Sequence, residues 1–349
     1  MRKKLLFYTG IGVFVVIVFV YFITSSWWWV GIIEIVFLFF LLLFFLFFLF
    51  LNFCVKKTNW YKNYFQYIGQ FVSNDAYRDD LIRNYEIVNL GSNPARFAFM
   101  YNHILGQNWS TGTQSLNYDF RLLKYYHSYL INGGVVLIPL VVFSSCYTDN
   151  LNDEVNYHIK FNRILPASLK FKNNIRERLG LRFPISSAPI EALKVLLKDK
   201  PIDLSLLTEC QPMDKKALMM DAENWLKGWK KEFNITDLEA PLTADNMARR
   251  CENINILREM IDFCLERGMK PVLVIPPMTH YLSMKFSESF RQNYIYSFVN
   301  ESNIQNVPFL DYMSDERFSD PEFYFNSFFL NRKGRELFTK QVLKDLKLI

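Results

Sequence analysis

The hydrophobic residues of the chain are concentrated near its N-terminus, in two runs that each suit a lipid bilayer. Residues 5–23 carry no charge, and residues 32–53 carry one, at Glu34. About twenty apolar residues are needed to cross the hydrocarbon core, and neither run shows the polar face of a soluble amphipathic helix. The pattern predicts a transmembrane helical hairpin over residues 1–55, and therefore a multi-pass membrane protein with the lipid bilayer as a partner.

Basic residues lie at both ends of this predicted hairpin. They occupy positions 2–4 before the first run and positions 56–57 after the second. The positive-inside rule would keep both ends in the cytoplasm. A cleaved signal peptide over residues 1–26 is the alternative, because a short basic start and an apolar core are also typical of such peptides. The side of the membrane that the soluble part faces stays open.

The pattern changes after residue 55. Residues 56–84 are aromatic and polar, and we expect a connecting helical segment there. From residue 85 onward, short apolar runs typical of buried strands alternate with amphipathic runs typical of helices, which predicts a parallel sheet between helices. The expected strands are 87–90, 135–143, 271–275 and 307–310, and the expected helices are 114–131, 247–266, 286–300 and 334–348.

The predicted fold class is thus α/β, with a three-layer, flavodoxin-like domain over residues 85–349. Residues 146–240 interrupt the alternation, because they are polar with short apolar patches. We interpret them as a helical insertion that covers one end of the sheet, in the position of a lid.

Composition and charge exclude few classes of function. The net charge of +6 is weak for a chain of 349 residues, and no cluster of basic and aromatic residues suggests binding to nucleic acid. The five cysteines show no spacing typical of a metal site. The sequence therefore predicts no cofactor, no metal and no nucleic-acid partner.

The first candidate functional residues along the chain are Gly91 and Ser92, directly after the first expected strand. A strand, a tight turn and a helix place the Ser92 hydroxyl at the carboxyl end of the sheet, where α/β proteins bind ligands. A serine that only caps the following helix is the simpler interpretation of this motif taken alone.

Several further sequence blocks, in their order along the chain, favour a functional site at Ser92 over a capping role alone. They are Asn89-Leu-Gly-Ser92, Gly112-Thr-Gln-Ser-Leu116 with Tyr118-Asp119, Gly133-Gly-Val-Val-Leu-Ile-Pro139, Lys270-Pro-Val-Leu-Val-Ile-Pro-Pro277, Val307-Pro-Phe-Leu-Asp-Tyr312 and Phe329-Leu-Asn-Arg-Lys-Gly334. Together they resemble the SGNH (GDSL-like) hydrolase superfamily, and in particular its membrane-anchored branch with the D-alanyl transfer protein of teichoic acid and the alginate O-acetylation proteins.

This resemblance implies that Ser92 is the nucleophile, activated by an Asp-x-x-His pair near the C-terminus. A serine hydroxyl needs such a base to accept its proton. At the matching positions this sequence has Asn326 and Phe329, and a phenylalanine accepts no proton. His280, after the third expected strand, and Asp311, at the end of the fourth, are the candidate substitutes. The resemblance also implies oxyanion or binding roles near the serine, for which the candidates are Gly91, Asn93, Gly112 and Gln114.

Two functions stay open at this point. The resemblance implies a bacterial cell-membrane protein linked to O-acylation of a cell-envelope polysaccharide. The replacements at Asn326 and Phe329 favour a pseudoenzyme that binds a glycan, or a lipid-linked glycan, or serves as partner of a membrane-bound O-acyltransferase. The alternative is an active serine esterase or O-acyltransferase in which Ser92 uses a rewired base such as His280.

Overall fold

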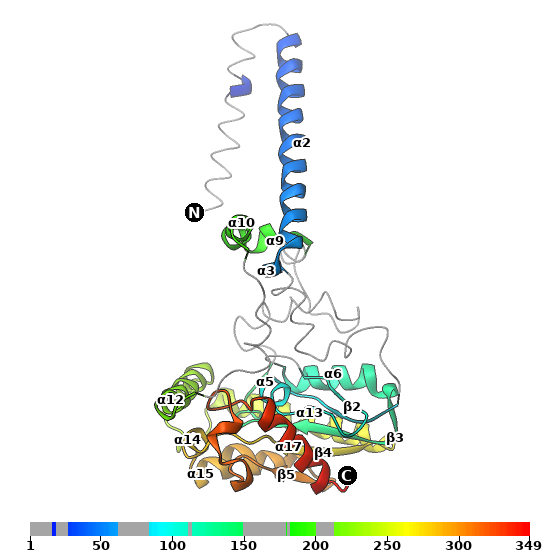
Figure 1. The fold of residues 1–349 in the computed structure, drawn as a ribbon, viewed down its shortest axis with the longest axis vertical. Coiled ribbons are helices and arrows are strands. Elements are labelled where there is room, and N and C mark those ends of the chain that lie inside the picture. The colour runs from blue at the N-terminus through cyan, green and yellow to red at the C-terminus, as the bar shows by residue number, and fades with distance from the viewer. Residues whose placement is uncertain are drawn as a thin grey trace. The chain divides into compact units, whose positions relative to one another are not determined.

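The computed structural model of the protein describes residues 16–18, 27–61, 84–110, 114–148, 179, 182–199 and 213–349 (Figure 1). The chain divides into two compact units. The first consists of residues 1–61 and 182–200, and the second of residues 62–181 and 201–349. Most of the first expected span, most of the connecting segment 56–84 and Gly112 lie outside the described residues.

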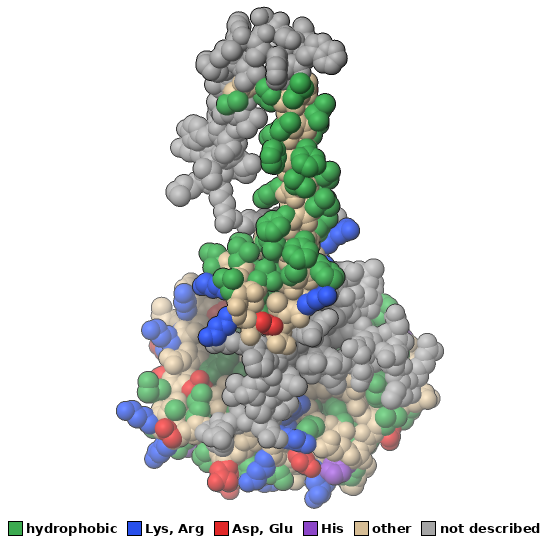
Figure 2. Space-filling view, turned by 45° about the horizontal axis from the view of Figure 1, so that its top comes forward, with side chains coloured by type: hydrophobic (Ala, Val, Ile, Leu, Met, Phe, Trp, Pro, Cys, Tyr) green, Lys and Arg blue, Asp and Glu red, His purple; other side chains and the backbone are tan. Residues whose placement is uncertain are grey.

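The first unit is built around the long helix α2 (Trp27–Lys57). Its stretch Val30–Lys57 is long and apolar enough to cross a membrane. No residue in the most apolar part of this stretch is buried. Hydrophobic side chains cover the helix (Figure 2). This helix contains the expected span 32–53 and extends beyond it at both ends. Within the described residues it is the one helix that meets this test, so the two-helix hairpin remains a prediction.

The second unit contains a parallel sheet of five strands in the order β2-β1-β3-β4-β5. That order is the one found in doubly wound, flavodoxin-like sheets. The strands are β1 (Tyr85–Asn89), β2 (Gly106–Asn108), β3 (Leu130–Pro139), β4 (Lys270–Ile275) and β5 (Phe309–Asp311). The sequence predicted four of them and missed β2, because Gly-Gln-Asn carries none of the β-branched or aromatic residues that mark a strand.

The sheet buries both of its faces. Alternate residues of a strand point to opposite faces, so Val88 and Val136 pack in one apolar cluster and their neighbours Ile87 and Val135 in another. The first cluster includes side chains of α6 and α13, and the second includes side chains of α17, which is red in Figure 1. Helices therefore cover the sheet on both sides.

Among the described residues, the helices of the second unit are α5 (Asn93–Arg96), α6 (Leu116–Tyr126), η3 (His127–Tyr129), α12 (Lys215–Glu232), α13 (Ala244–Glu266), α14 (His280–Ser283), α15 (Glu288–Phe290), the π-helical η6 (Arg291–Tyr296), α16 (Ser297–Ser302), η7 (Glu316–Phe318), η8 (Pro321–Phe323) and α17 (Arg332–Asp345). The first unit adds α3 (Asn59–Tyr61), α9 (Pro184–Ser187) and α10 (Pro189–Leu197). The expected insertion 146–240 thus contributes α9 and α10 to the first unit and α12 to the second.

Candidate functional site

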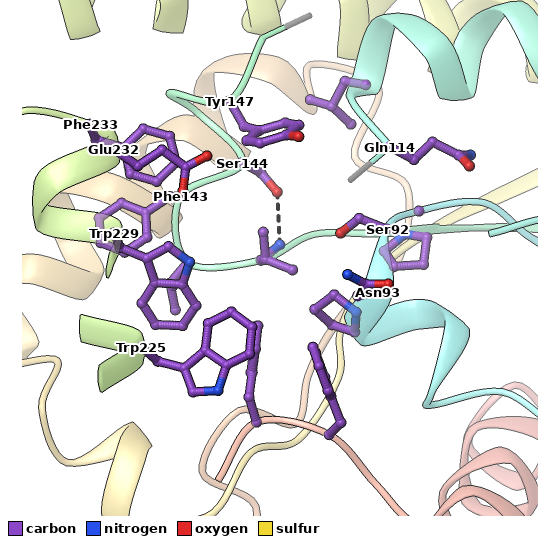
Figure 3. Close-up of a pocket in the computed structure, with 18 of the residues that line it drawn as sticks. Ser92, Asn93, Gln114, Phe143, Ser144, Tyr147, Trp225, Trp229, Glu232 and Phe233 are labelled. Atoms are coloured by element: carbon purple, nitrogen blue, oxygen red, sulfur yellow. Dashed lines mark hydrogen bonds between the residues drawn. The ribbon is translucent and has the colours of Figure 1, made fainter. Parts of the chain in front are cut away.

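A pocket of about 140 Å³ lies where the strand order reverses in the sheet (Figure 3). Its walls include residues 91–94, which follow β1, and residues 139 and 141–144, which end and follow β3. The two strands are neighbours, but the chain leaves them towards β2 on one side and β4 on the other. In open α/β sheets this reversal creates the crevice that holds ligands.

The turn that opens the pocket depends on Gly91. Its φ of +103° lies in a region that L-amino acids with a side chain rarely adopt. A Cβ atom at this position would also meet the Cβ of Ala95 at 2.8 Å. The turn leads into the short helix α5, and Ser92 occupies its N-cap position without making a capping hydrogen bond. The Ser92 hydroxyl lines the pocket instead (Figure 3), which argues against the interpretation of Ser92 as a cap alone.

Asp119 fastens this turn from the first turn of α6. Its side chain is buried, and its Oδ1 accepts a hydrogen bond of 2.9 Å from the Gly91 amide. The same oxygen accepts a hydrogen bond from Nε2 of Gln114. Asn93, Gln114 and Asp119 all line the pocket. The sequence singled out Asn93 and Gln114 as binding residues but gave Asp119 no role, although an acidic residue in the first turn of a helix beside the predicted site was the available signal.

Asn326 and Phe329 occupy structural positions. The Asn326 Oδ1 accepts the amides of Phe328 and Phe329 at 2.9 and 2.7 Å, which closes a tight turn. The Phe329 ring lines the pocket and stacks on Phe97 and Phe328, with ring centroids 5.1 and 5.0 Å apart. The structure therefore brings Phe329 to the same pocket as Ser92, as an aromatic wall.

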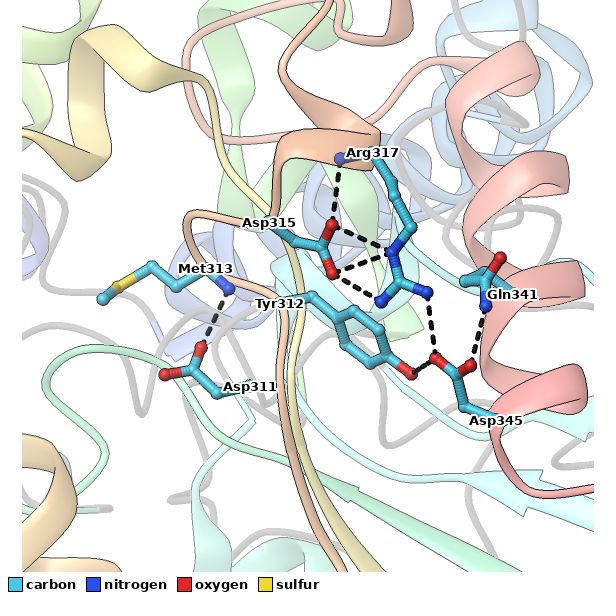
Figure 4. Close-up of polar contacts among 7 residues, drawn as sticks. All are labelled: Asp311, Tyr312, Met313, Asp315, Arg317, Gln341 and Asp345. Atoms are coloured by element: carbon cyan, nitrogen blue, oxygen red, sulfur yellow. Dashed lines mark hydrogen bonds and ion pairs between the residues drawn. The ribbon is translucent and has the colours of Figure 1, made fainter.

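His280 and Asp311 do not line this pocket. His280 is exposed at the first position of α14. Asp311 ends β5, and its carboxylate accepts a hydrogen bond from the Tyr296 hydroxyl at 2.8 Å. It also accepts the Met313 amide at 2.9 Å (Figure 4). A Ser92–His280–Asp311 set is thus not brought together.

The residues after Asp311 fasten β5 to the C-terminal helix (Figure 4). The Tyr312 hydroxyl donates to Asp345 of α17 at 2.7 Å, and Arg317 pairs with both Asp315 and Asp345. The Arg317 guanidinium lowers the pKa of Asp315 below its ordinary value. Asp315 and Arg317, which follow Asp311, are therefore paired with each other and, through Arg317, with α17.

Helix α12 supplies an aromatic wall that the sequence did not assign to the site. Trp225 and Trp229 line the pocket from this helix, with ring centroids 5.4 Å apart. Phe143 from the β3 side packs against Trp229 at 5.4 Å. Glu232, one turn further along α12, also lines the pocket (Figure 3), and burial raises its pKa above the ordinary value of 4.5.

The functional groups in the described wall limit the chemistry that the pocket can perform. Its wall holds the Ser92 hydroxyl at the end of β1, the hydroxyls of Ser144 and Tyr147, and two carboxylates at Asp119 and Glu232. The described lining residues include no histidine, lysine or arginine. A serine without a neighbouring base is a weak nucleophile. Among the described residues, no three His, Cys, Asp or Glu side chains gather as metal ligands.

Comparisons with known proteins leave the family of this chain open. No family model and no curated protein matches it. A crystal structure of protein YXIM from Bacillus subtilis is similar at a TM-score of 0.36 and 11% identity, over 77% of this chain. The match spans 58% of the length of that Bacillus chain. A likeness this weak adds nothing to the description of the fold or the site.

Proposed function

We propose that this is a membrane-anchored, SGNH-like protein whose pocket at the end of β1 binds a ligand of the cell envelope without hydrolysing it. The ligand class is a glycan or a lipid-linked glycan, in a system that O-acylates envelope polysaccharide, and a membrane-bound O-acyltransferase is the expected protein partner. The polypeptide would be a pseudoenzyme that retains the binding site of a serine hydrolase.

One observation supports this proposal above the others. Phe329, at the position where the resemblance expects the catalytic histidine, lies in the same pocket as Ser92. It is held there by stacking on Phe97 and Phe328. A phenyl ring neither accepts nor donates a proton, so the site has an aromatic surface where a hydrolase needs a base.

The pocket walls indicate the kind of ligand. Aromatic side chains supply large apolar faces, and a few polar groups around them give orientation. Ser92, Asn93 and Ser144 offer such groups, which suits a sugar ring with hydroxyls at its edge. With two carboxylates and no basic residue in the described wall, the pocket favours neutral or cationic parts of a ligand over phosphates and carboxylates. A lipid-linked glycan would therefore enter with its sugar and not with its phosphate.

Binding is tested by tryptophan fluorescence with neutral, acidic and O-acetylated oligosaccharides. We expect neutral fragments to change the emission of the wild-type protein, with a weaker response in Trp229→Ala. Tyr125→Ala changes an exposed aromatic residue outside the pocket and is the matched control. An equal response in Trp229→Ala and the wild type, or tighter binding of acidic than of neutral fragments, would refute the proposed ligand class.

The proposed loss of the catalytic base is tested with a variant that restores an imidazole at position 329. The double variant Asn326→Asp, Phe329→His places a carboxylate and an imidazole at the family positions. We expect hydrolysis of a simple ester such as p-nitrophenyl acetate to rise about 10²-fold, the lower end of what a positioned base contributes. The control is the same double variant with Ser92→Ala, which should remove the gain.

An active esterase is the second candidate, and the Ser92 hydroxyl supports it. That hydroxyl makes no capping hydrogen bond and lines the pocket. It is thereby available to a ligand, as a nucleophile would be. The described pocket offers it carboxylates only, which makes this candidate the weaker of the two.

A further inference from the structure

Part of the polypeptide far from α2 in sequence is folded onto its C-terminal end. The ring of Phe183 packs on Phe48 of α2 with centroids 5.5 Å apart. The amide of Ile185 in α9 donates to Oδ1 of Asn52 at 3.2 Å. At the other end of this segment, the Asp199 carboxylate accepts the amide of Asn59 at 2.7 Å. The segment with α9 and α10 is therefore tied to the last turns of α2 at one end and to α3, which follows α2, at the other (Figure 1).

The length of α2 fixes the depth at which this attachment occurs. An α-helix rises 1.5 Å per residue, so the 18 steps from Val30 to Phe48 cover about 27 Å. The hydrocarbon core of a bilayer is about 30 Å thick. If α2 enters the core near Val30, after the tryptophans at 27–29 that suit an interface, it leaves the core close to Phe48. Residues 56 and 57, both lysines in the last turn of α2, then reach the headgroups.

Helix α10 presents an exposed apolar stripe at this depth. Ile190, Leu193 and Leu197 are 63%, 46% and 90% exposed, and their spacing of three and four residues places them on one side of the helix. Ala192, on another side, is fully buried. Lys194 is exposed on α10 beside the stripe, and Lys198 follows the helix.

We propose that α10 is an interfacial helix that lies on the membrane surface beside α2. Ile190, Leu193 and Leu197 insert into the boundary between headgroups and acyl chains, where the apolar face of an amphipathic helix is stable. Lys194 and Lys198 extend their ammonium groups towards lipid phosphates. The unit formed by residues 1–61 and 182–200 thus holds the protein by a span and by a helix parallel to the surface.

The occupant of the stripe is lipid rather than another protein, because of where the stripe lies. The exposed apolar surface of α2 needs a bilayer around it, and α10 is attached to α2 at the edge of that bilayer. Because α10 contacts α2, its exposed stripe lies beside the lipid-covered helix and meets lipid as well. This inference concerns the membrane anchor and does not depend on the function of the pocket.

The test uses the full-length protein in vesicles of phosphatidylethanolamine and phosphatidylglycerol, with the photo-crosslinker p-benzoylphenylalanine placed at one position at a time. Leu193 and Leu197 probe the stripe, and Glu191, exposed on the polar side of the same helix, is the matched control. Phe44, 69% exposed on α2, is the positive control for contact with acyl chains. Adducts are read by intact-mass spectrometry.

We expect lipid adducts at Leu193 and Leu197 in at least about fivefold excess over Glu191, because only the apolar face of an interfacial helix reaches the acyl chains. Equal adducts at all three α10 positions would overturn the proposal. So would adducts at Phe44 alone, or crosslinks from Leu193 to a second copy of the protein in place of lipid.

Discussion

The backbone amide of Gly91 donates a 2.9 Å hydrogen bond to the buried carboxylate of Asp119, which lies 28 residues further along the chain. This contact joins the turn after β1 to the first turn of α6. A hydrogen bond to a charged group contributes about 1.5–3 kcal/mol. It fixes the backbone on which Ser92 and Asn93 face the pocket, so the geometry of the site is set by a residue outside the turn itself.

Gly91→Ala should destabilise the protein more than Gly133→Ala does. Both glycines have a positive φ, which costs a residue with a side chain about 1–3 kcal/mol. At Gly91 the new Cβ also meets Ala95 at 2.8 Å and Pro139 at 3.2 Å, whereas at Gly133 the nearest atom is 3.9 Å away. Overpacking adds about 1–3 kcal/mol at Gly91. Urea unfolding measures the free energy of unfolding of both variants. Equal losses of that free energy would contradict the close packing around Gly91.

Ser92→Ala should leave the stability of the domain almost unchanged. The Ser92 side chain makes no capping hydrogen bond, whereas Ser115 caps α6 by accepting the Tyr118 amide at 3.1 Å. Removing a capping side chain costs about 1 kcal/mol. Thermal unfolding of Ser92→Ala and Ser115→Ala should therefore show a loss for the second variant only. A comparable loss in Ser92→Ala would mean that Ser92 is a structural cap after all.

Glu232→Gln should stabilise the protein at neutral pH and lose this advantage in acid. Burial raises the pKa of Glu232 in the folded state, so the folded protein favours the protonated carboxyl. The contribution of Glu232 to stability is complete below its ordinary, unfolded pKa of 4.5 and is lost as the pH rises through the folded pKa. Melting temperatures at pH 4 and pH 7 test this, with Glu252→Gln at an exposed position of α13 as control. An equal effect of Glu232→Gln at both pH values would contradict the assigned burial.

Alkaline pH should weaken the fold through Cys264. Its thiol is buried in the core, and burial raises its pKa from 9.0 to about 12. Between these values the unfolded state has released a proton that the folded state still holds. The free energy of unfolding then falls by up to about 1.4 kcal/mol per pH unit for this group. Urea midpoints at pH 8 and pH 10 should fall less in Cys264→Ala than in the wild type, and parallel declines would count against this cause.

Much of the sheet could be predicted from the sequence, because buried parallel strands are continuous apolar runs. The run at 271–275 matches β4, and the run at 87–90 overlaps β1. The strand at Gly106–Asn108 could not be predicted, since it is held by backbone pairing with β1 and has no apolar pattern. The run at 135–143 overlaps β3, but β3 starts earlier, at Leu130, inside the expected helix 114–131. The run also continued past Pro139, where the chain leaves the sheet to line the pocket.

The candidate site was predictable in part. The turn at Gly91-Ser92 could be found from a local pattern of strand, small residues and helix. The aromatic wall from Trp225 and Trp229 could not, because it depends on where α12 packs in three dimensions. The hydrogen bond between Asp119 and Gly91 could not be predicted either, because it joins two segments that meet only in the folded protein. The attachment of α9 to α2 depends on contacts such as the Ile185 amide with Asn52, which are 133 positions apart and share no pattern in the sequence.

The most direct test of the account is whether a fluorophosphonate probe labels the purified, folded wild-type protein. Such probes react with serines whose hydroxyl has been activated by a base. We predict no labelling of the wild type at neutral pH, and labelling in Asn326→Asp, Phe329→His. Labelling of the wild type that disappears in Ser92→Ala would contradict the account, because it would show that Ser92 still functions as a nucleophile.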